Sequence, residues 1–297
     1  MMKKNESKPE NEIIKAVGPQ KKKRILVIGK NSYIGDAVAD YLITSPEYYE
    51  VESIDAKGLI PNSEMFKGYD VLFDVAGIAH IKETNENRHL FYEVNRDLTI
   101  QVAEAAKKAG VNSFIVLSSM SVYGKEKGHI TSLTEPDPYT AYGKSKLEAD
   151  RILLQMNCEA FNVAILRPPM VYGKDCKGNY QLLRKFAIKS PIFPSYQNQR
   201  SMIYIGNLCE FVKRVIDGNH SGVFLPQNAE YVCTSDMVFA ISRINGKKCR
   251  KISALNILIK ILPIGLLDKV FGNLTYEKIH TIGKYSFSES IKLTERE

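Results

Sequence analysis

The chain has 297 residues, and 44% of them are hydrophobic, so it can bury a full core as one large domain or as two interleaved lobes. Its formal net charge is +8, but the first 24 residues hold eight Lys or Arg against three Glu and carry +5 of that total. The remaining body has no basic stripe with interleaved aromatic residues, which argues against a nucleic-acid partner.

Residues 1–20 lack apolar periodicity and are expected to form a flexible charged N-terminal arm. No apolar stretch follows the first lysines, so the arm does not resemble a secretory signal. The five cysteines and five histidines are widely scattered, without a C-x-x-C pair. This spacing is typical of reduced thiols in a cytoplasmic protein, and we expect neither a disulfide framework nor a metal site.

From residue 24 onward, short β-rich runs alternate with helical stretches. The expected strands are RILVIG (24–29), YEVESID (49–55), YDVLFDVAG (69–77), SFIVLSS (113–119) and FNVAILRPP (161–169), and the expected helices cover 33–44, 88–110 and 142–156. Nearly continuous apolar runs indicate strands covered on both faces, and the alternation predicts a parallel sheet wrapped by crossover helices.

We therefore predict an α/β fold, with a Rossmann-like doubly wound parallel sheet over 21–172. After about residue 172 the order loosens and the loops lengthen. Residues 173–297 are expected to form mainly a smaller C-terminal substrate-binding lobe, which can interleave with the Rossmann domain. Doubly wound folds bind ligands at the carboxyl ends of their strands, so this lobe should lie over that edge of the sheet.

The sequence GKNSYIG at 29–35 follows the first strand and opens the first helix. Gly29 allows a tight turn, Gly35 allows close packing of the helix, and Ser32 stands where the backbone should approach a pyrophosphate. Backbone amides after Gly29 and the Ser32 hydroxyl can donate to phosphate oxygens. The alternative is an ordinary strand-to-helix turn.

An acid follows the second strand at the spacing that a dinucleotide site requires. Asp55 comes 20 residues after Gly35, where it can accept the adenosine ribose hydroxyls. With Asp55, the loop predicts an NAD site, completed by Asn31, Tyr33 and Ile34. NADP is the alternative cofactor, because Lys57 can offset repulsion between Asp55 and a 2′-phosphate.

Tyr142 and Lys146 stand four residues apart, on one face of the helix expected at 142–156. An adjacent ammonium lowers the pKa of a tyrosine from about 10, which makes the phenol a usable general acid or base for an alcohol/ketone pair. Tyr123 and Lys127 share the spacing, but they lie in a polar, glycine-containing loop, so this match is expected to be accidental.

Several stretches resemble one family. LSSMSVYG (117–124) and PYTAYGKSK (138–146) resemble the serine strand and catalytic helix of the extended short-chain dehydrogenase/reductases, and the chain is similar to their nucleotide-sugar epimerase and reductase branch. The resemblance extends over roughly residues 24–210 through DVAGIAH (74–80), EVNRDLT (93–99), ILRPPMVYG (165–173) and NQRSMIYIGNL (198–208). One departure is Ser32, where the family usually has glycine.

The resemblance implies a role for each matching residue. Tyr142 is the acid/base, Lys146 binds the nicotinamide ribose and lowers the pKa of Tyr142, and Ser119 hydrogen-bonds the reacting oxygen. The implied cofactor contacts beyond the glycine loop are Ala76, Gly77, Asn95, Tyr142, Lys146 and Pro168. The implied substrate contacts are Ser119, Ser121, Tyr142, Pro169, Asn179 and Arg200, with Arg200 on a diphosphate.

The resemblance also implies a UDP-sugar as the substrate and leaves several functions open. A 4,6-dehydratase would need an acidic pair directly after the serine, where this chain has Met120 and Ser121. We favour NAD(P)H-dependent reduction at C4 of a UDP-4-keto-6-deoxy-N-acetylhexosamine for surface polysaccharide, with an NAD-dependent UDP-sugar 4-epimerase as the alternative. A catalytically inactive NAD(P)-binding scaffold or sensor is the alternative of another class. We expect a homodimer.

Residues 247–274 combine an apolar stretch with a basic cluster at 247–251. Lys260, Pro263, Gly265 and Asp268 interrupt the stretch, so it falls short of a spanning helix. We expect two packed helices of the substrate lobe here. The alternative is a face that contacts a partner or a membrane surface.

Overall fold

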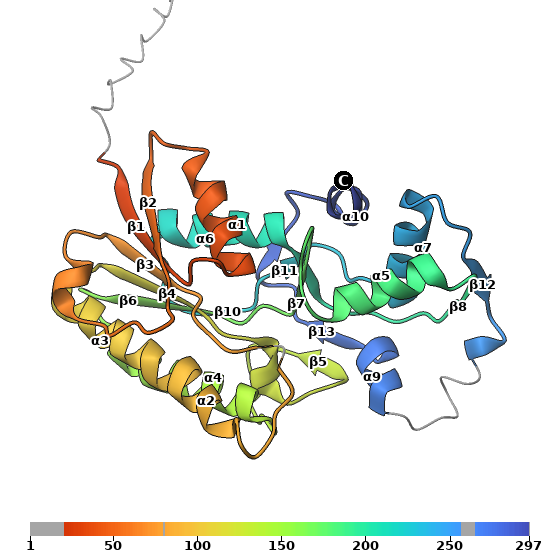
Figure 1. Ribbon diagram of the computed structural model, residues 1–297, viewed down its shortest axis with the longest axis horizontal. Coiled ribbons are helices and arrows are strands. Elements are labelled where there is room, and N and C mark those ends of the chain that lie inside the picture. The colour runs from red at the N-terminus through yellow and green to blue at the C-terminus, as the bar shows by residue number, and fades with distance from the viewer. Residues whose placement is uncertain (1–20, 80, 257–264, 297) are drawn as a thin grey trace, which may run out of the picture.

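The computed structural model describes residues 21–79, 81–256 and 265–296, so the arm expected over 1–20 lies outside the described residues. A six-stranded sheet in the order β2-β1-β3-β4-β6-β10 forms the centre of the molecule (Figure 1). Its strands are β1 (Lys23–Ile28), β2 (Tyr49–Ile54), β3 (Val71–Asp74), β4 (Ser113–Leu117), β6 (Asn162–Leu166) and β10 (Gly222–Phe224). Every neighbouring pair is parallel, which confirms the predicted Rossmann-like doubly wound fold.

The strands form where apolar residues run without interruption. The last four residues of β1 and all four of β3 are buried. Ile25 and Val27 pack with Phe73 on one face of the sheet, and Leu26 and Ile28 pack on the other, so apolar side chains line both faces. Because the chain passes from β2 back across β1 to β3, the strand order reverses between β1 and β3. Doubly wound folds bind ligands beyond the carboxyl ends at such a point.

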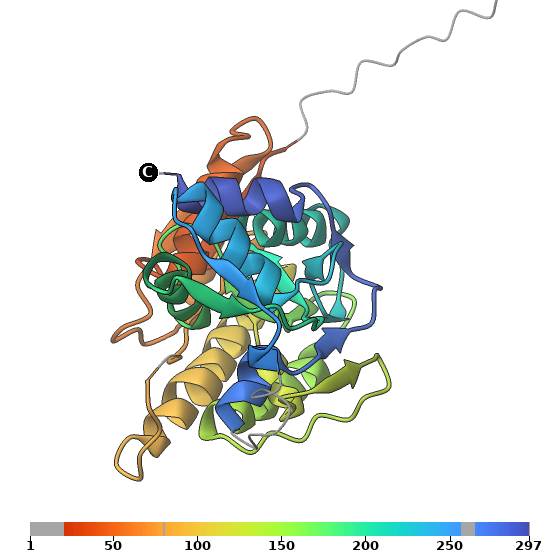
Figure 2. The ribbon, with the colours of Figure 1, turned by 90° about the vertical axis from the view of Figure 1, so that its right-hand side faces the viewer.

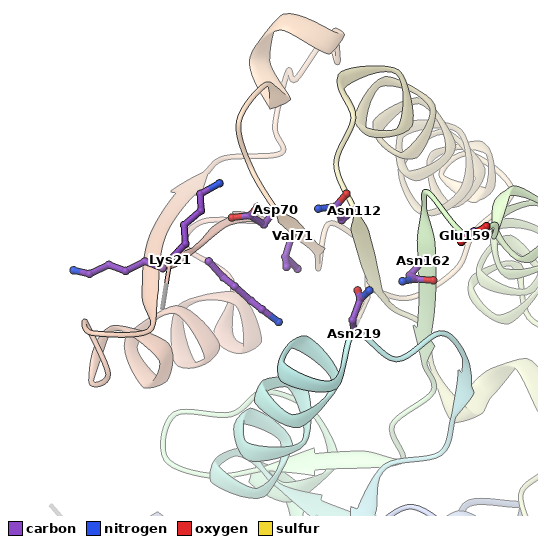
Figure 3. Close-up of a pocket in the computed structure, with 9 residues that line it drawn as sticks. Lys21, Asp70, Val71, Asn112, Glu159, Asn162 and Asn219 are labelled. Carbon is purple, nitrogen blue, oxygen red and sulfur yellow. The ribbon is translucent and has the colours of Figure 1, made fainter. Parts of the chain in front are cut away.

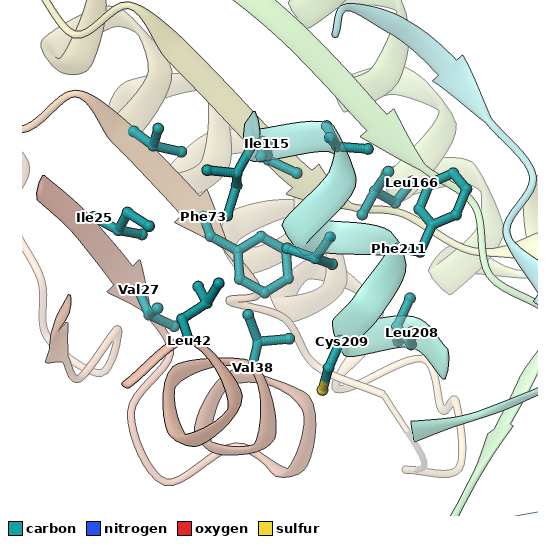
Figure 4. Packing of buried hydrophobic residues seen from close by; sticks show 14 of the residues in the cluster. Ile25, Val27, Val38, Leu42, Phe73, Ile115, Leu166, Leu208, Cys209 and Phe211 are labelled. Atoms are coloured by element: carbon teal, nitrogen blue, oxygen red, sulfur yellow. The ribbon is translucent and has the colours of Figure 1, made fainter. Parts of the chain in front are cut away.

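Helices cover both faces of this sheet. α1 (Tyr33–Ile43) and α6 (Ile205–Gly218) cover one face, where Val38 and Leu208 pack with Phe73 in the cluster of Figure 4. On the other face lie α3 (Thr99–Ala109) and α4 (Ala141–Met156). Both α6 and β10 come from beyond residue 172, so the chain returns from the second lobe to complete the sheet.

The helical stretch expected at 88–110 is not one regular helix. α2 (Arg88–Tyr92) and α3 are joined by a π-helical stretch, η2 (Glu93–Leu98). α3 ends at Gly110, whose φ of +81° lets it cap the helix in the left-handed region. The π-helical stretch includes Asn95, one of the residues expected at the cofactor.

The second lobe combines short strand pairs with helices, and it faces the viewer in Figure 2. Its core includes Tyr172 and Tyr180, whose stacked rings lie 5.7 Å apart. Its helices are α5 (Asn179–Lys189), α7 (Thr234–Ile244), α9 (Gly265–Phe271) and α10 (Phe287–Glu295). The strand pairs are β7 (Met170–Tyr172) with β9 (Met202–Tyr204), β8 (Ile192–Pro194) with β12 (Arg250–Ile252), β11 (Gln227–Asn228) with β14 (Thr281–Ile282), and β5 (Gly128–Ile130) with β13 (Leu274–Tyr276).

The expectation of two packed helices over 247–274 is wrong for the first part of that range. Residues 250–252 form β12, because Arg250 pairs with Ile192 and the Arg250 amide donates to the Pro191 carbonyl at 2.8 Å. α9 occupies 265–271, and 257–264 lie outside the described residues. Among the helices that the structure describes, none is long and apolar enough to cross a membrane.

Candidate active site

The glycine loop between β1 and α1 is a tight turn held by β2. The amides of Gly29 and Lys30 both donate to the Ile54 carbonyl at 2.9 Å. Gly29 has φ +124°, and a Cβ there would lie 2.7 Å from Val75 Cγ2. A Cβ on Gly35 would lie 2.8 Å from the Gly29 carbonyl oxygen. Both positions therefore require glycine for the turn and for the packing of α1.

Ser32, which stands in place of the usual glycine, is the N-cap of α1. Its Oγ accepts from the Gly35 amide at 3.1 Å, and its own amide donates to the Gly29 carbonyl at 3.1 Å. The Asn31 amide donates to Asp36 Oδ1 at 3.0 Å. Most of the amides expected to face a phosphate are thus used within the loop.

Two amides of the loop remain open. Among the described residues, the backbone N–H groups of Tyr33 and Ile34 have no acceptor. They are the first two amides of an 11-residue helix, where the unsatisfied N–H groups and the helix dipole favour an anion. With the Ser32 hydroxyl beside them, these donors fit a dinucleotide pyrophosphate.

Substitution of Ser32 tests this assignment. Ser32→Phe is expected to lower NADH affinity at least tenfold, because the ring fills the space in front of the open amides. Ser32→Gly should keep the affinity within about threefold, since glycine costs only a few tenths of a kcal/mol as an N-cap. Fluorescence titration with NADH measures both variants. Wild-type affinity in Ser32→Phe would contradict the assignment.

Asp55 lies directly after β2, next to the carbonyl that holds the glycine loop. Its side chain is exposed, and Oδ1 accepts from the Lys57 amide at 2.9 Å. The second carboxylate oxygen therefore remains available for a ribose hydroxyl. This position agrees with the role expected for Asp55, which stays a prediction.

Ser119, Tyr142 and Lys146 gather at the carboxyl edge of the sheet, beyond β4. Ser119 caps η3 (Met120–Tyr123), and its Oγ accepts from the Ser121 amide at 3.1 Å. Tyr142 is the second residue of α4, which Thr140 caps through the Gly143 amide. The Ser119 hydroxyl also donates to Ser121 Oγ at 3.2 Å. Ser119 lies close enough to Tyr142 to lower the pKa of its phenol, so the two hydroxyls can approach one oxygen.

The electrostatics of Tyr142 differ from the expectation. Burial raises the pKa of Tyr142, and the nearby Ser119 hydroxyl opposes the rise. The expected lowering by Lys146 does not appear, because Lys146 Nζ points into the sheet edge. It donates to the Leu117 carbonyl at 2.9 Å and to the Ala76 carbonyl at 3.4 Å. Burial lowers the pKa of Lys146, and Asp74 and Asp150 oppose that change.

Asn95 fixes the loop that follows β3. Its Oδ1 accepts from the Ile78 amide at 2.7 Å, and its Nδ2 donates to the Ile78 carbonyl at 3.1 Å and to Ser145 Oγ at 3.3 Å. A Cβ on Gly77 would lie 3.0 Å from Asn95 Oδ1 and 3.2 Å from Lys146 Nζ. The loop of Ala76 and Gly77 therefore lies close against Lys146.

A buried charged network lies behind α4, and sequence reasoning missed it. Asp150 Oδ2 accepts from Arg167 Nε and from Ser118 Oγ, each at 2.9 Å. Arg167 also donates to the Tyr123 hydroxyl at 3.0 Å. Tyr123 is thus a buried partner of Arg167, which agrees with the expectation that its spacing from Lys127 is accidental. Asp150 stands four residues after Lys146, a spacing that could have revealed it.

The residues expected to hold the substrate are more dispersed. Pro168 and Pro169 follow Arg167, and the Pro168 carbonyl accepts from the Met120 amide at 2.9 Å. Ser121 is exposed beside Ser119, and Asn179 is exposed as the first residue of α5.

Arg200 is half-buried rather than a free surface charge. Its Nη1 donates to the Gly272 carbonyl at 2.8 Å, and burial lowers its pKa while Glu126 opposes the change. In the described part of the chain, neither Arg200 nor Asn179 hydrogen-bonds the residues around Tyr142, so their substrate roles stay predictions.

A cavity of about 290 Å³ lies elsewhere, at the amino ends of the strands. The residues that line it include Lys21, Asp70, Asn112, Asn162 and Asn219 (Figure 3). Acids, lysines and amides line it together, so it presents no single charge. Because ligands of doubly wound folds bind at the carboxyl edge, this cavity is not the candidate active site.

Comparison with known proteins identifies the family. The protein-family model described as "NAD dependent epimerase/dehydratase family" matches residues 25–224. The chain therefore belongs to the NAD-dependent epimerase/dehydratase family, in agreement with the resemblance seen in its sequence. The open amides of Tyr33 and Ile34 show that its glycine loop retains donors for the cofactor that the family name implies.

Two relatives are named as 4-epimerases. N-acetyl-alpha-D-glucosaminyl-diphospho-ditrans,octacis-undecaprenol 4-epimerase of Escherichia coli O157:H7 is 31% identical over 206 residues, which are 64% of this chain and 62% of that protein. UDP-glucose 4-epimerase of Vibrio cholerae is 30% identical over 244 residues, which are 73% of this chain and 74% of that protein. The match thus spans less than two thirds of the first of these proteins.

Solved structures share the fold. UDP-glucuronic acid 4-epimerase from Bacillus cereus in complex with NAD matches with a TM-score of 0.73 at 19% identity, over 92% of this chain and 95% of that one. A dTDP-4-dehydrorhamnose reductase from Clostridium acetobutylicum matches with a TM-score of 0.65 at 24% identity, over 77% of this chain and 84% of that one. At these identities, the likeness concerns the fold alone.

Proposed function

We propose that the protein is an NAD-dependent 4-epimerase of a hexose or N-acetylhexosamine carried on a diphosphate, with a UDP-sugar as the expected substrate. The observation that carries the proposal is the meeting of Ser119, Tyr142 and Lys146 at the edge of the sheet where the open amides of Tyr33 and Ile34 lie. The two relatives named as 4-epimerases favour epimerisation over the reduction that the sequence alone favoured.

The residues around Tyr142 can carry out the proton transfer that such a reaction needs. Tyr142, when ionised, accepts the proton of the C4 hydroxyl, and the Ser119 hydroxyl holds the reacting oxygen. Lys146, fixed by the Leu117 and Ala76 carbonyls, would hold the nicotinamide ribose. Bound NAD would supply a hydride acceptor at C4 and return the hydride to either face. Because burial raises the pKa of Tyr142, the ionised fraction should grow as pH rises above neutrality.

The proposed diphosphate site uses Arg200. Its Nη1 is held by the Gly272 carbonyl, which orients the guanidinium while leaving further N–H groups for phosphate oxygens. Asn179, exposed at the start of α5, is the proposed second contact. Neither residue distinguishes a diphosphate-linked sugar that carries a nucleotide from one that carries a polyprenol, so substrates of both kinds should be tested.

A product analysis tests the proposed function. The purified protein is incubated without added cofactor with UDP-glucose, with UDP-N-acetylglucosamine, and with a short-chain polyprenyl-diphospho-N-acetylglucosamine. We expect NMR to show inversion at C4 in at least one arm, together with NAD retained through purification. Tyr142→Phe is the matched control and should give no inversion.

The same experiment identifies the alternatives. Consumption of NADH with a UDP-4-keto-6-deoxy-N-acetylhexosamine, without C4 inversion in the other arms, would establish the reductase instead. NAD binding without turnover in any arm would favour the inactive scaffold.

A further inference from the structure

Asp74 is a buried carboxylate to which the proposed reaction gives no role. It ends β3, and the residue is only 1% exposed. Its Oδ1 accepts from the Ala76 amide at 2.9 Å, and its Oδ2 has no hydrogen-bond partner among the described residues. A carboxylate in such surroundings is costly unless another group compensates its charge. We therefore looked for the group that compensates the charge of Asp74.

One peptide segment connects Asp74 to Lys146. The Ala76 amide donates to Asp74, and the Ala76 carbonyl accepts from Lys146 Nζ at 3.4 Å. No ion pair joins Asp74 and Lys146 directly in the part of the chain that the structure describes. The two charges therefore act on each other through space. Asp74 also fixes the backbone of Ala76, whose carbonyl accepts from Lys146.

The other titratable and polar groups near Lys146 either are paired with another residue or carry no charge. Asp150 on α4 is held by Arg167 and Ser118. Tyr142 on α4 and Tyr123 on η3 are phenols, and the latter accepts from Arg167. At this point η2 and α3 contribute neutral groups: the Asn95 amide and the Thr99 hydroxyl. Asp74 is thus the carboxylate whose charge remains for Lys146.

We propose that Asp74 is a positioning residue for Lys146: it fixes the backbone of Ala76, whose carbonyl accepts from the lysine, and its negative charge keeps the buried ammonium protonated. This inference rests on the proposed function, in which Lys146 holds the cofactor. It adds a carboxylate to the serine, tyrosine and lysine of the site.

The titration behaviour agrees with this geometry. Burial raises the pKa of Asp74 to about 6, while Lys146, the Ala76 amide and Thr99 oppose the rise. Of the two carboxylates that raise the pKa of Lys146, Asp74 has the larger effect. Above about pH 6, Asp74 is ionised and supports the ammonium, and below that pH the support is lost. The raised pKa also means that the folded state favours the protonated form of Asp74. Its contribution to stability is therefore fully present at a pH below the usual pKa of aspartate and is lost as the pH rises through about 6.

Asp74→Asn separates the charge from the hydrogen bond, because an amide oxygen can still accept from Ala76. NADH affinity should fall at alkaline pH, where Lys146 loses its proton, and we call the midpoint of this fall the alkaline limit. In Asp74→Asn we expect the alkaline limit to move to lower pH by about one unit, since Lys146 loses its counter-charge. The melting temperature at pH 7 should stay equal or rise, because a buried charge is removed. A merely structural role would instead lower the melting temperature and leave the alkaline limit unchanged.

Two further measurements keep the inference testable. Asp70→Asn, at the opposite end of β3, is the matched control and should leave the alkaline limit in place. In Lys146→Met, the pKa of Asp74, followed by carboxyl carbon NMR, should rise, because the ammonium normally opposes the effect of burial. An unmoved limit in Asp74→Asn, or an unchanged Asp74 pKa in Lys146→Met, would overturn the inference. If Lys146→Met leaves both NADH affinity and turnover unchanged, the assignment of Lys146 in the proposed function fails instead.

Discussion

Tyr142→Phe is expected to lower kcat by about a hundredfold to ten-thousandfold while leaving NADH affinity nearly unchanged. In the proposed reaction the phenol exchanges a proton with the C4 hydroxyl, and loss of a positioned acid or base has costs of this size. The ring itself remains edge-on to Phe91, with centroids 6.5 Å apart, so the packing of α4 should persist. Turnover and NADH titration at one pH measure the two quantities.

Tyr123→Phe is the control for this prediction, since both tyrosines have a lysine four residues later. The Tyr123 hydroxyl is buried and accepts from Arg167, so its loss should reduce stability by about 1–3 kcal/mol. Its effect on kcat should be within a few fold at temperatures where the variant is folded. Equal activity of the two variants would show that the acid/base is a different residue.

Arg167→Met is expected to lower the free energy of unfolding by about 3–5 kcal/mol, because it breaks a buried ion pair by removing one partner. Arg167 is 6% exposed, and Asp150 is 1% exposed, so removal of the guanidinium leaves a buried carboxylate with Ser118 as its remaining partner. Urea denaturation at pH 7 measures the change.

The double variant Arg167→Met with Asp150→Asn is the matched control. Replacing both charges removes the unpaired carboxylate, so the double variant should regain a large part of the lost stability. Additive losses in the two single variants and the double variant would show that the two residues do not form a coupled pair.

The main elements of the fold could be predicted where apolar residues run or repeat along the sequence. ILVI in β1, VLF in β3 and FIVL in β4 are apolar runs, and α4 follows the polar N-cap Thr140. β10 could not be predicted, because three residues at 222–224 become a strand only by pairing with β6. The π-helical stretch at 93–98 likewise gives no periodic signal that distinguishes it from α-helix.

The arrangement of the candidate site could be predicted only where the spacing of residues along one element determines it. Tyr142 and Lys146 share a helix face, as expected, but the direction of the Lys146 side chain depends on carbonyls at the ends of β3 and β4. The Arg167–Asp150 pair joins β6 to α4 and required the tertiary structure. Asp74 had a readable signal, because an acid inside the apolar run DVLFDVAG must either be compensated or break the strand.

The return of the chain from the second lobe has a consequence for how the protein must be made. The apolar surface of β1, β3 and α1 is covered by α6, which comes about 130 residues after β3 in a cluster that also includes Ile203. A nascent chain that ends before α6 would expose this surface while it waits on the ribosome. Completion of the sheet is therefore a late event in synthesis, and an isolated fragment ending at residue 172 should aggregate instead of folding into a separate cofactor domain.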